Sequence, residues 1–218
     1  ARQYNTVIRR LTGRPAATPE FPSRLLLSLS LARVGAYAEA VRTIDAAGTS
    51  WPEGLLEEER FIRSVQISTL AGDFAAAYGE AGRGAEKYPG SILPALRDGL
   101  SAHDTLSRRS RPVAAALSAA LPGAGQAYAG RYADAAWSFT AVLALGAGTV
   151  WAWRQGHRGA AFTIGFFTTL VYAGNIYGGW NAADGFNRAQ GDGFRTNVLR
   201  TIPEYDPLRV GNPPWIFR

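Results

Sequence analysis

Two long apolar stretches, residues 132–153 and 159–180, constrain this chain more than any other feature. A helix rises about 1.5 Å per residue, so roughly 20 apolar residues cross the ~30 Å hydrocarbon core of a bilayer. Both stretches reach that length, and the one formally charged residue within them is Asp134, near the start of the first. Only residues 154–158 separate the two. The pair predicts a transmembrane helical hairpin, and therefore an integral membrane protein whose polar part works beside the membrane.

Composition excludes several classes of function. The chain has 218 residues, a net charge of +6 and no cysteine. The lack of cysteine excludes disulfides and thiolate metal sites. The two histidines, His103 and His157, lie in different contexts without clustered acidic partners, so neither a metal nor another cofactor is expected. Nucleic-acid binding requires a basic stripe with interleaved aromatic residues, and none is visible.

The first half contains an internal repeat, in which residues 31–40 align with residues 68–77. The aligned pairs are Gly35 with Gly72, Tyr37 with Phe74, Ala40 with Ala77, and Pro52 with Pro89. The glycine allows a first helix to end tightly, and the aromatic residue starts a second helix and fills the gap between the two. The alanine is small where the helices cross, and the proline ends the second helix because it cannot continue the hydrogen-bond ladder.

This pattern resembles the tetratricopeptide repeat. The alternative is two unrelated amphipathic hairpins. Residues 3–14 have helical spacing too, and are expected to form part of a further repeat or a cap. The resemblance implies a surface that docks another protein, with Tyr37, Phe74, Arg33 and Arg63 as the candidate contacts; the alternative is a spacer.

A basic junction separates the two halves. Arg108, Arg109 and Arg111, together with Arg131 further on, are suited to anionic lipid headgroups, at about 1 kcal/mol for each residue near the surface. An ordinary polar linker is the alternative. Residues 113–121 are apolar but too few to span a bilayer, which predicts an interfacial or re-entrant helix.

A glycine-rich motif follows, Leu-Pro-Gly-Ala-Gly-Gln-Ala-Tyr-Ala-Gly-Arg at residues 121–131. It predicts a tight turn whose exposed carbonyl groups Gln126 and Arg131 satisfy. It lacks the Gly-Lys-Ser/Thr ending and the preceding strand of a nucleotide-binding loop. The motif and the hairpin behind it resemble a poorly characterised family of two-helix bacterial membrane domains, some of which follow an N-terminal repeat region and a signal peptide. The resemblance implies an envelope location and no particular reaction.

Small residues within the hairpin predict close helix packing, either inside the chain or in a homo-oligomer. The candidates are Gly146, Gly165, Gly174 and Gly178. Asn175 is the one strongly polar residue deep in the second span, and we expect it to hydrogen-bond across helices. No charged residue lies in the middle of either span, which argues against a proton relay or an ion pump.

The charges leave the topology open. Arg154 and Arg158 favour a cytoplasmic loop between the spans, whereas the more numerous arginines at the other ends favour the reverse. The resemblance implies a bacterial inner-membrane protein with periplasmic repeats. A removed signal peptide would explain a start at Ala1, and so would methionine removal or trimming.

The expected fold is all-α, with a repeat domain at 1–107, a junction at 108–131, a transmembrane hairpin at 132–187 and an extended proline-rich tail at 188–218. No convergent nucleophile, base and acid are visible, so no enzyme is expected. The predicted function is a non-enzymatic accessory or scaffold subunit, whose partners are the bilayer and other subunits of a membrane complex. The alternative is an oligomeric transport or lipid-handling component.

Overall fold

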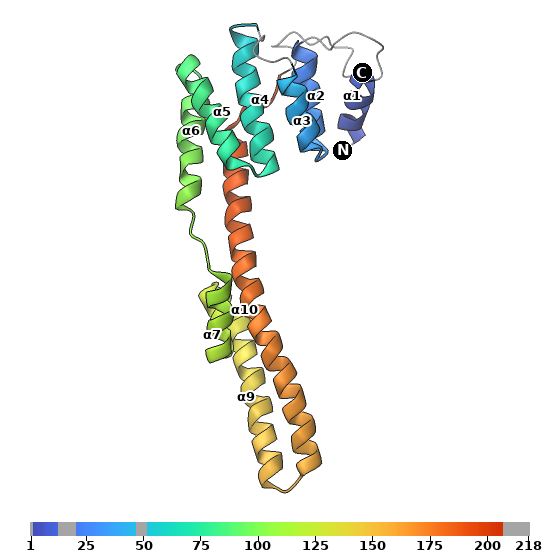
Figure 1. The fold of residues 1–218 in the computed structure, drawn as a ribbon, viewed down its shortest axis with the longest axis vertical. Coiled ribbons are helices and arrows are strands. Elements are labelled where there is room, and N and C mark those ends of the chain that lie inside the picture. The colour runs from blue at the N-terminus through green and yellow to red at the C-terminus, as the bar shows by residue number, and fades with distance from the viewer. Residues whose placement is uncertain (1, 13–20, 47–51, 207–218) are drawn as a thin grey trace. The chain divides into compact units, whose positions relative to one another are not determined.

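The computed structural model describes residues 2–12, 21–46 and 52–206, and every regular element within these ranges is helical (Figure 1). The all-α prediction is therefore confirmed. The elements are α1 (Arg2–Thr12), α2 (Phe21–Arg33), α3 (Tyr37–Asp45), α4 (Leu55–Ala71), α5 (Phe74–Lys87), α6 (Leu93–Ser101), the 3-10 helix η1 (Ala102–Thr105), α7 (Arg111–Ala120), α8 (Ala124–Tyr128), α9 (Tyr132–Arg154) and α10 (Arg158–Thr201).

The chain divides into two compact units. The first combines residues 1–105 with residues 193–218, and the second comprises residues 106–192. The last turns of α10 thus belong to the first unit, while the rest of this helix belongs to the second.

The prediction of an extended tail from residue 188 is wrong for its first part, because α10 continues to Thr201. Residues 188–201 contain no proline, and their apolar side chains Phe194 and Val198 pack into the core of the first unit. The helix ends just before Pro203, since a proline disfavours helical geometry in the residue that precedes it. The remainder of the predicted tail, residues 207–218, lies outside the described residues.

The first unit contains two helical hairpins, α2–α3 and α4–α5. Gly35 and Gly72 stand at equivalent places after α2 and α4, with φ of +88° and +80°. Such left-handed geometry favours glycine because it has no Cβ. Tyr37 and Phe74 are the first residues of α3 and α5, as the repeat predicts. Each hairpin therefore turns at its glycine and restarts at its aromatic residue.

The alanines of the repeat belong to the two hydrophobic clusters of this unit. Ala40 and Ala77 are both fully buried. The role predicted for the prolines holds only once: α5 ends at Lys87, two residues before Pro89, but α3 already ends at Asp45, so Pro52 does not terminate it. The two hairpins thus share their turn and a buried alanine but differ in the length of their second helix.

Two hydrophobic clusters form the core of the first unit. One lies among α1, α2, α3 and part of α4, and includes Leu25, Ile44 and Ile67. The other lies among α4, α5, α6 and the end of α10, and includes Val65 and Leu93. Because α4 contributes to both clusters, it is the central helix of this unit.

In the second unit, α9 and α10 form an antiparallel hairpin that turns at Gly156, whose φ is +80°. Both helices are long and apolar enough to cross a membrane, and little of their apolar windows is buried, 6% in α9 and 11% in α10. Trp137 and Phe162 are 75% and 70% exposed. The shorter helices α7 and α8 lie against one end of this hairpin (Figure 1).

Candidate functional site

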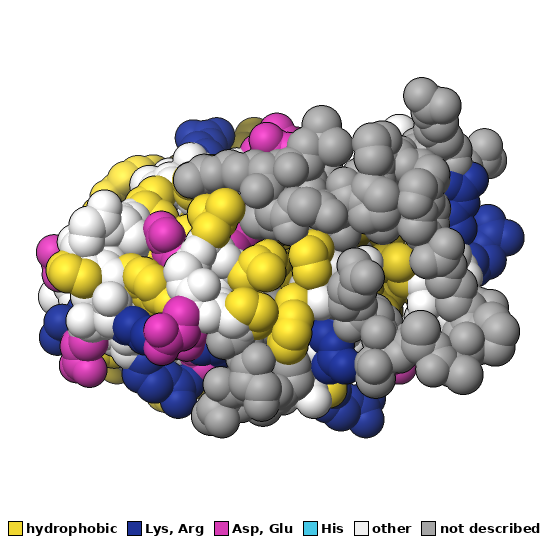
Figure 2. Space-filling model, turned by 90° about the horizontal axis from the view of Figure 1, so that it is seen from above, with side chains coloured by type: hydrophobic (Ala, Val, Ile, Leu, Met, Phe, Trp, Pro, Cys, Tyr) yellow, Lys and Arg dark blue, Asp and Glu magenta, His cyan; other side chains and the backbone are white. Residues whose placement is uncertain are grey.

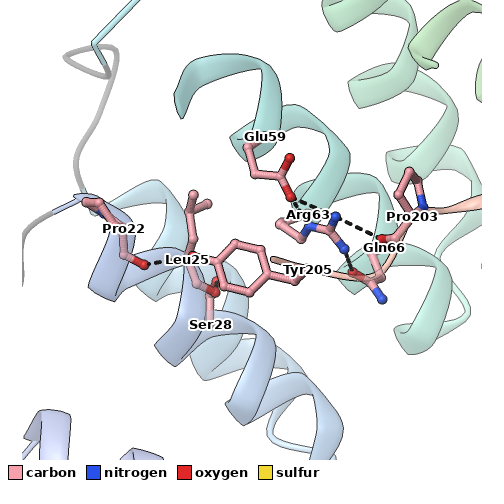
Figure 3. A network of polar contacts seen from close by, with 8 residues as sticks. All are labelled: Pro22, Leu25, Ser28, Glu59, Arg63, Gln66, Pro203 and Tyr205. Atoms are coloured by element: carbon pink, nitrogen blue, oxygen red, sulfur yellow. Dashed lines mark hydrogen bonds and ion pairs between the residues drawn. The ribbon is translucent and has the colours of Figure 1, made fainter. Parts of the chain in front are cut away.

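Arg63 occupies the centre of a buried polar network on α4 (Figure 3). Its guanidinium donates from Nε to Glu59 Oε1 at 2.7 Å and from Nη1 to Gln66 Oε1 at 2.5 Å. Its Nη2 donates to the carbonyl oxygen of Pro203 at 3.0 Å. Glu59, Arg63 and Gln66 share one face of α4 because residues three and four apart are neighbours on a helix. We call this network, in which Arg63 with Glu59 and Gln66 holds the segment that follows α10, the clamp.

Burial removes water from the charges of this clamp, which costs free energy that the interactions within the clamp must offset. Only 1% of Arg63 is exposed, and Glu59 is also buried. Burial lowers the pKa of Arg63, and the charge and hydrogen bond of Glu59 only partly counter that effect. Removing one partner of a buried ion pair costs about 3–5 kcal/mol, because the other charge stays buried. The carbonyl of Pro203 thus supplies part of the solvation that this guanidinium has lost.

Tyr205 secures the same segment against α2. Its hydroxyl donates to the carbonyl oxygen of Pro22 at 3.2 Å, and its ring packs onto the first hydrophobic cluster. The guanidinium of Arg63 lies 5.5 Å from the centre of this ring. Figure 3 shows Tyr205 between the Pro22–Ser28 part of α2 and Arg63 of α4. Residues 203–205 therefore lie as an extended strap across two helices.

The four candidate partner contacts do not form one surface. Tyr37 packs against the first hydrophobic cluster. Phe74 stacks on His103 and Phe194, with ring centres 4.6 and 5.2 Å away. Arg33 is exposed and lines a small cavity beside Tyr205. Arg63 is the residue among them that holds an extended segment, and the segment belongs to the same chain.

Sequence reasoning missed the other members of the clamp, which are Glu59, Gln66, Pro203 and Tyr205. A usable signal was present: Glu59, Arg63 and Gln66 follow one another at spacings of four and three residues, which places them on one face of a helix. No local signal links them to Pro203, which is 140 residues away from Arg63 in the chain.

A separate groove of about 590 Å³ lies among α3, α4 and α5. Its apolar lining includes Val41 and Ile67. The Ser64 hydroxyl lines it too, and this buried hydroxyl has no hydrogen-bond partner among the described residues. The charged side chains of the lining are Asp45, Asp73, Glu80 and Arg83. The groove thus combines an apolar wall, three carboxylates and one arginine with an unused hydrogen-bonding group.

In the second unit, Asn175 on α10 organises the glycine-rich turn. Its Oδ1 accepts from the backbone nitrogen of Gly123 at 2.8 Å, and its Nδ2 donates to the carbonyl of Ser118 at 2.9 Å. Gln126 donates from Nε2 to the Asn175 carbonyl at 3.2 Å and accepts from the Ser118 hydroxyl at 3.0 Å. The expectation that Asn175 bonds across helices is confirmed: its partners are Ser118 in α7, Gln126 in α8, and Gly123 in the turn between these helices.

Two glycines of the motif are required by close backbone approach. A Cβ on Gly123, whose φ is +86°, would lie 2.3 Å from the carbonyl oxygen of Ala135. A Cβ on Gly125 would lie 2.0 Å from the carbonyl oxygen of Ala114. Atoms cannot approach so closely, and the obstacles are backbone groups that cannot rotate away. The motif is therefore a steric requirement of this fold.

The four small residues proposed for membrane packing have different environments. A Cβ on Gly178 would meet the Gln126 side chain at 2.8 Å, so this glycine faces α8. A Cβ on Gly165 would meet Thr149 at 3.4 Å, across the hairpin. Gly146 and Gly174 have no such neighbour within 4 Å among the described residues.

The basic junction gathers against α10. Asn187 holds both backbone groups of Arg109: its Oδ1 accepts from the nitrogen at 2.7 Å, and its Nδ2 donates to the carbonyl at 2.9 Å. The Arg109 guanidinium carbon lies 5.0 Å from the ring centre of Tyr128 and 5.3 Å from that of Phe186. Its Nε is buried without a hydrogen-bond partner. Arg109 is therefore fixed in place by neutral groups.

Asp184 is the acidic residue of this cluster. It pairs with Arg111 at 2.5 Å and, through its other oxygen, with Arg188. Arg131, also predicted to contact headgroups, instead pairs with Asp134 at 2.5 Å at the start of α9. The structure thus places Arg109 and Arg111 against residues 184–187 of α10, adds Arg188 to the Asp184 pair, and places Arg131 in a separate pair. Arg108 is exposed just before them.

No group of three His, Asp or Glu side chains is arranged to hold a metal ion in the part of the chain that the structure describes. Comparison with models of known protein families, with curated protein sequences and with solved structures finds no match.

Proposed function

We propose that this protein is a non-enzymatic accessory subunit of a bacterial membrane complex. In this proposal the α9–α10 hairpin anchors it in the inner membrane, and the helical hairpins of the first unit dock a partner protein. The observation that carries the proposal is the strap at Arg63, because it is an extended segment already bound across α2 and α4. Helices that bind one extended segment through side-chain contacts are suited to binding another.

The exposure of the hairpin supports the anchoring role. Large apolar side chains point outward along its length, among them Trp137, Leu143, Phe162 and Phe166, each at least 60% exposed. Soluble monomers rarely expose contiguous apolar patches of more than a few hundred Å². Lipid chains are the simplest cover for two helices of this length.

The repeated turn supports the docking role. Glycine, aromatic residue and alanine take equivalent places in the two hairpins, as expected for units like the tetratricopeptide repeat. The face drawn in Figure 2 carries hydrophobic side chains bordered by side chains of both charges, and no continuous basic stripe crosses its described part. That mixture favours a protein partner over nucleic acid.

The groove among α3, α4 and α5 is the surface that we assign to the partner. The strap covers a different face, and no described segment fills the groove. Three of its four charged lining residues are acidic, and Ser64 offers an unused hydroxyl. We therefore expect an amphipathic partner segment that carries apolar and basic side chains.

Photo-crosslinking in native membranes tests this assignment. A photoreactive phenylalanine analogue would replace Ala76, which lines the groove, and in a matched control Glu86, which is exposed on the same helix outside it. We expect a discrete adduct from position 76 only, and loss of that adduct when Glu80→Lys is added. Mass spectrometry should place the crosslink in a partner segment with Lys or Arg among apolar residues. Equal adducts from both positions, or none from either, would contradict docking at this groove.

A further inference from the structure

The arginine cluster of the second unit lies at a definite depth if α9 and α10 cross a bilayer. Trp180 ends the apolar stretch of α10, and Asp184 and Arg188 follow one and two turns later on the same helix. At about 1.5 Å per residue, they lie roughly 6 and 12 Å beyond Trp180 along the helix axis. The polar layer adds about 5–8 Å on each side of the hydrocarbon core. Asp184 therefore lies at the depth of the lipid phosphates, and Arg188, a few ångströms further out, can extend its long side chain back toward them.

Positive charge exceeds negative charge in this cluster. Arg111 and Arg188 share the single carboxylate of Asp184. Arg109 makes no ion pair with any acidic side chain among the described residues. The aromatic rings of Tyr128 and Phe186 flank its guanidinium, but they do not neutralise it. Among the described residues, one carboxylate therefore faces three arginines, which leaves the cluster with a net positive charge.

Arg109 is also held in place and adjoins a second source of positive potential. Two hydrogen bonds from Asn187 hold its backbone, and the rings of Tyr128 and Phe186 flank its guanidinium, so less conformational freedom is lost when Arg109 binds a ligand. Helix α7 begins at Arg111, directly beside it, and a helix N-terminus carries a partial positive charge. Arginine suits phosphate because its planar fork can donate two parallel hydrogen bonds.

We infer that Arg109, Arg111 and Arg188, at the start of α7, form a binding site for the phosphate of an anionic lipid headgroup. The site rests on the proposed membrane anchoring but not on the docking of a partner. Its lipid neutralises Arg109 and competes with Asp184 for Arg111 and Arg188. Binding of that lipid fixes α7 and the glycine-rich turn against α10.

The test is a lipid titration of the full-length protein in detergent, followed by native mass spectrometry and thermal unfolding. Phosphatidylglycerol is compared with phosphatidylcholine and with inorganic phosphate. Arg109→Gln should weaken phosphatidylglycerol binding about five-fold, since one basic residue near a membrane surface contributes about 1 kcal/mol. Arg158→Gln is the matched control, because Arg158 also stacks on a ring, that of Trp153, at the opposite end of the hairpin. It should leave the affinity within two-fold.

Asp184→Asn separates a lipid site from a merely structural cluster. Removing the internal carboxylate frees Arg111 and Arg188, so we expect phosphatidylglycerol to bind several-fold more tightly, a gain that misfolding cannot produce. Equal affinity for phosphatidylcholine, or unchanged binding by Arg109→Gln, would overturn the inference. An equal effect of inorganic phosphate would overturn the lipid assignment in favour of the free anion. Carbonate extraction of membranes tests anchoring separately: release of the protein refutes anchoring, whereas retention without lipid preference refutes only this site.

Discussion

The guanidinium of Arg63 donates a hydrogen bond to the carbonyl oxygen of Pro203 at 3.0 Å, although the two residues are 140 positions apart in the chain. This bond joins the central helix of the first unit to the strap that follows α10. Because Arg63 is buried with Glu59, the strap completes the coordination of a charge that water cannot reach. The stability of the first unit should therefore depend on residues that are far apart in the chain.

Arg63→Met should destabilise the protein strongly. The substitution keeps the apolar stem but leaves Glu59 buried and unpaired, for which we expect a loss of about 3 kcal/mol. Denaturant unfolding in detergent, followed by circular dichroism, measures this change. Arg83→Met is the control, because the Arg83 side chain is 68% exposed in its ion pair with Glu80 and should cost less than about 1 kcal/mol. Equal losses would refute the clamp.

Gly125→Ala should prevent the second unit from packing. Its Cβ would lie 2.0 Å from a backbone oxygen of α7, a contact that only displacement of a helix can relieve. Gly174→Ala adds the same methyl group to open space in α10 and should be tolerated, with a helix-propensity gain of up to about 1 kcal/mol. Yield of folded protein and protease resistance report the difference. Similar behaviour of the two variants would show that the turn is not tightly packed.

Asn175→Ala should loosen the glycine-rich turn. It leaves the backbone nitrogen of Gly123 and the carbonyl of Ser118 without their side-chain partner, and each unsatisfied buried group costs about 1–3 kcal/mol. Hydrogen exchange at Gly123 is the direct measurement and should become faster. Thr169→Ala, which removes a hydroxyl bonded only to the carbonyl of Gly165 in its own helix, should leave this exchange unchanged.

Glu57→Gln should change how stability depends on pH. Burial alone would raise the pKa of Glu57, but hydrogen bonds from Lys87 and Tyr88 and the Lys87 charge outweigh it and lower the pKa below its ordinary value of 4.5. The hydrogen bond to Glu57 raises the pKa of Lys87 above 10.5. The Glu57 contribution is thus complete above pH 4.5 and lost as the pH falls further. The Lys87 contribution is complete below pH 10.5 and lost as the pH rises further.

Denaturant midpoints measured from pH 3 to pH 11.5 check this prediction. The wild type should lose stability at both extremes, and Glu57→Gln should flatten both limbs while lowering the plateau between them. Glu58→Gln removes the same charge from a neighbouring residue without a hydrogen bond or ion pair among the described residues, so both limbs should persist. Unchanged limbs in Glu57→Gln would show that other groups cause them.

The sequence predicted features that depend on neighbours along the chain. The apolar stretches 132–153 and 159–180 match α9 and the first half of α10, because helix length follows from an uninterrupted run of suitable residues. Gly35 and Gly72 were assigned to turns because glycine, which has no Cβ, adopts left-handed backbone geometry without steric cost wherever it stands in the chain. The extended tail was mispredicted because the prolines beyond residue 202 were taken to describe the whole segment from residue 188. The spacing of Phe194 and Val198, which is typical of one face of a helix, was overlooked.

The candidate sites were only partly predictable. The charge pattern indicated Arg109 and Arg111, but their association with Arg188 and Asp184 required the packing of α7 on α10. The glycine-rich turn was recognisable, whereas the reason for Gly125, the nearby Ala114 carbonyl, was not.

The sequence alone determined the helical character of the chain, its apolar hairpin and its repeated turns, since these depend on backbone freedom and on the periodicity of nearby side chains. Tertiary structure alone decided which polar groups are buried together: Arg63 with Pro203, and Asn175 with Gly123. The physical reason is that a buried polar group gains its stability from whichever partner the fold brings within hydrogen-bonding distance. That partner can lie anywhere along the chain, so spacing in the sequence does not identify it.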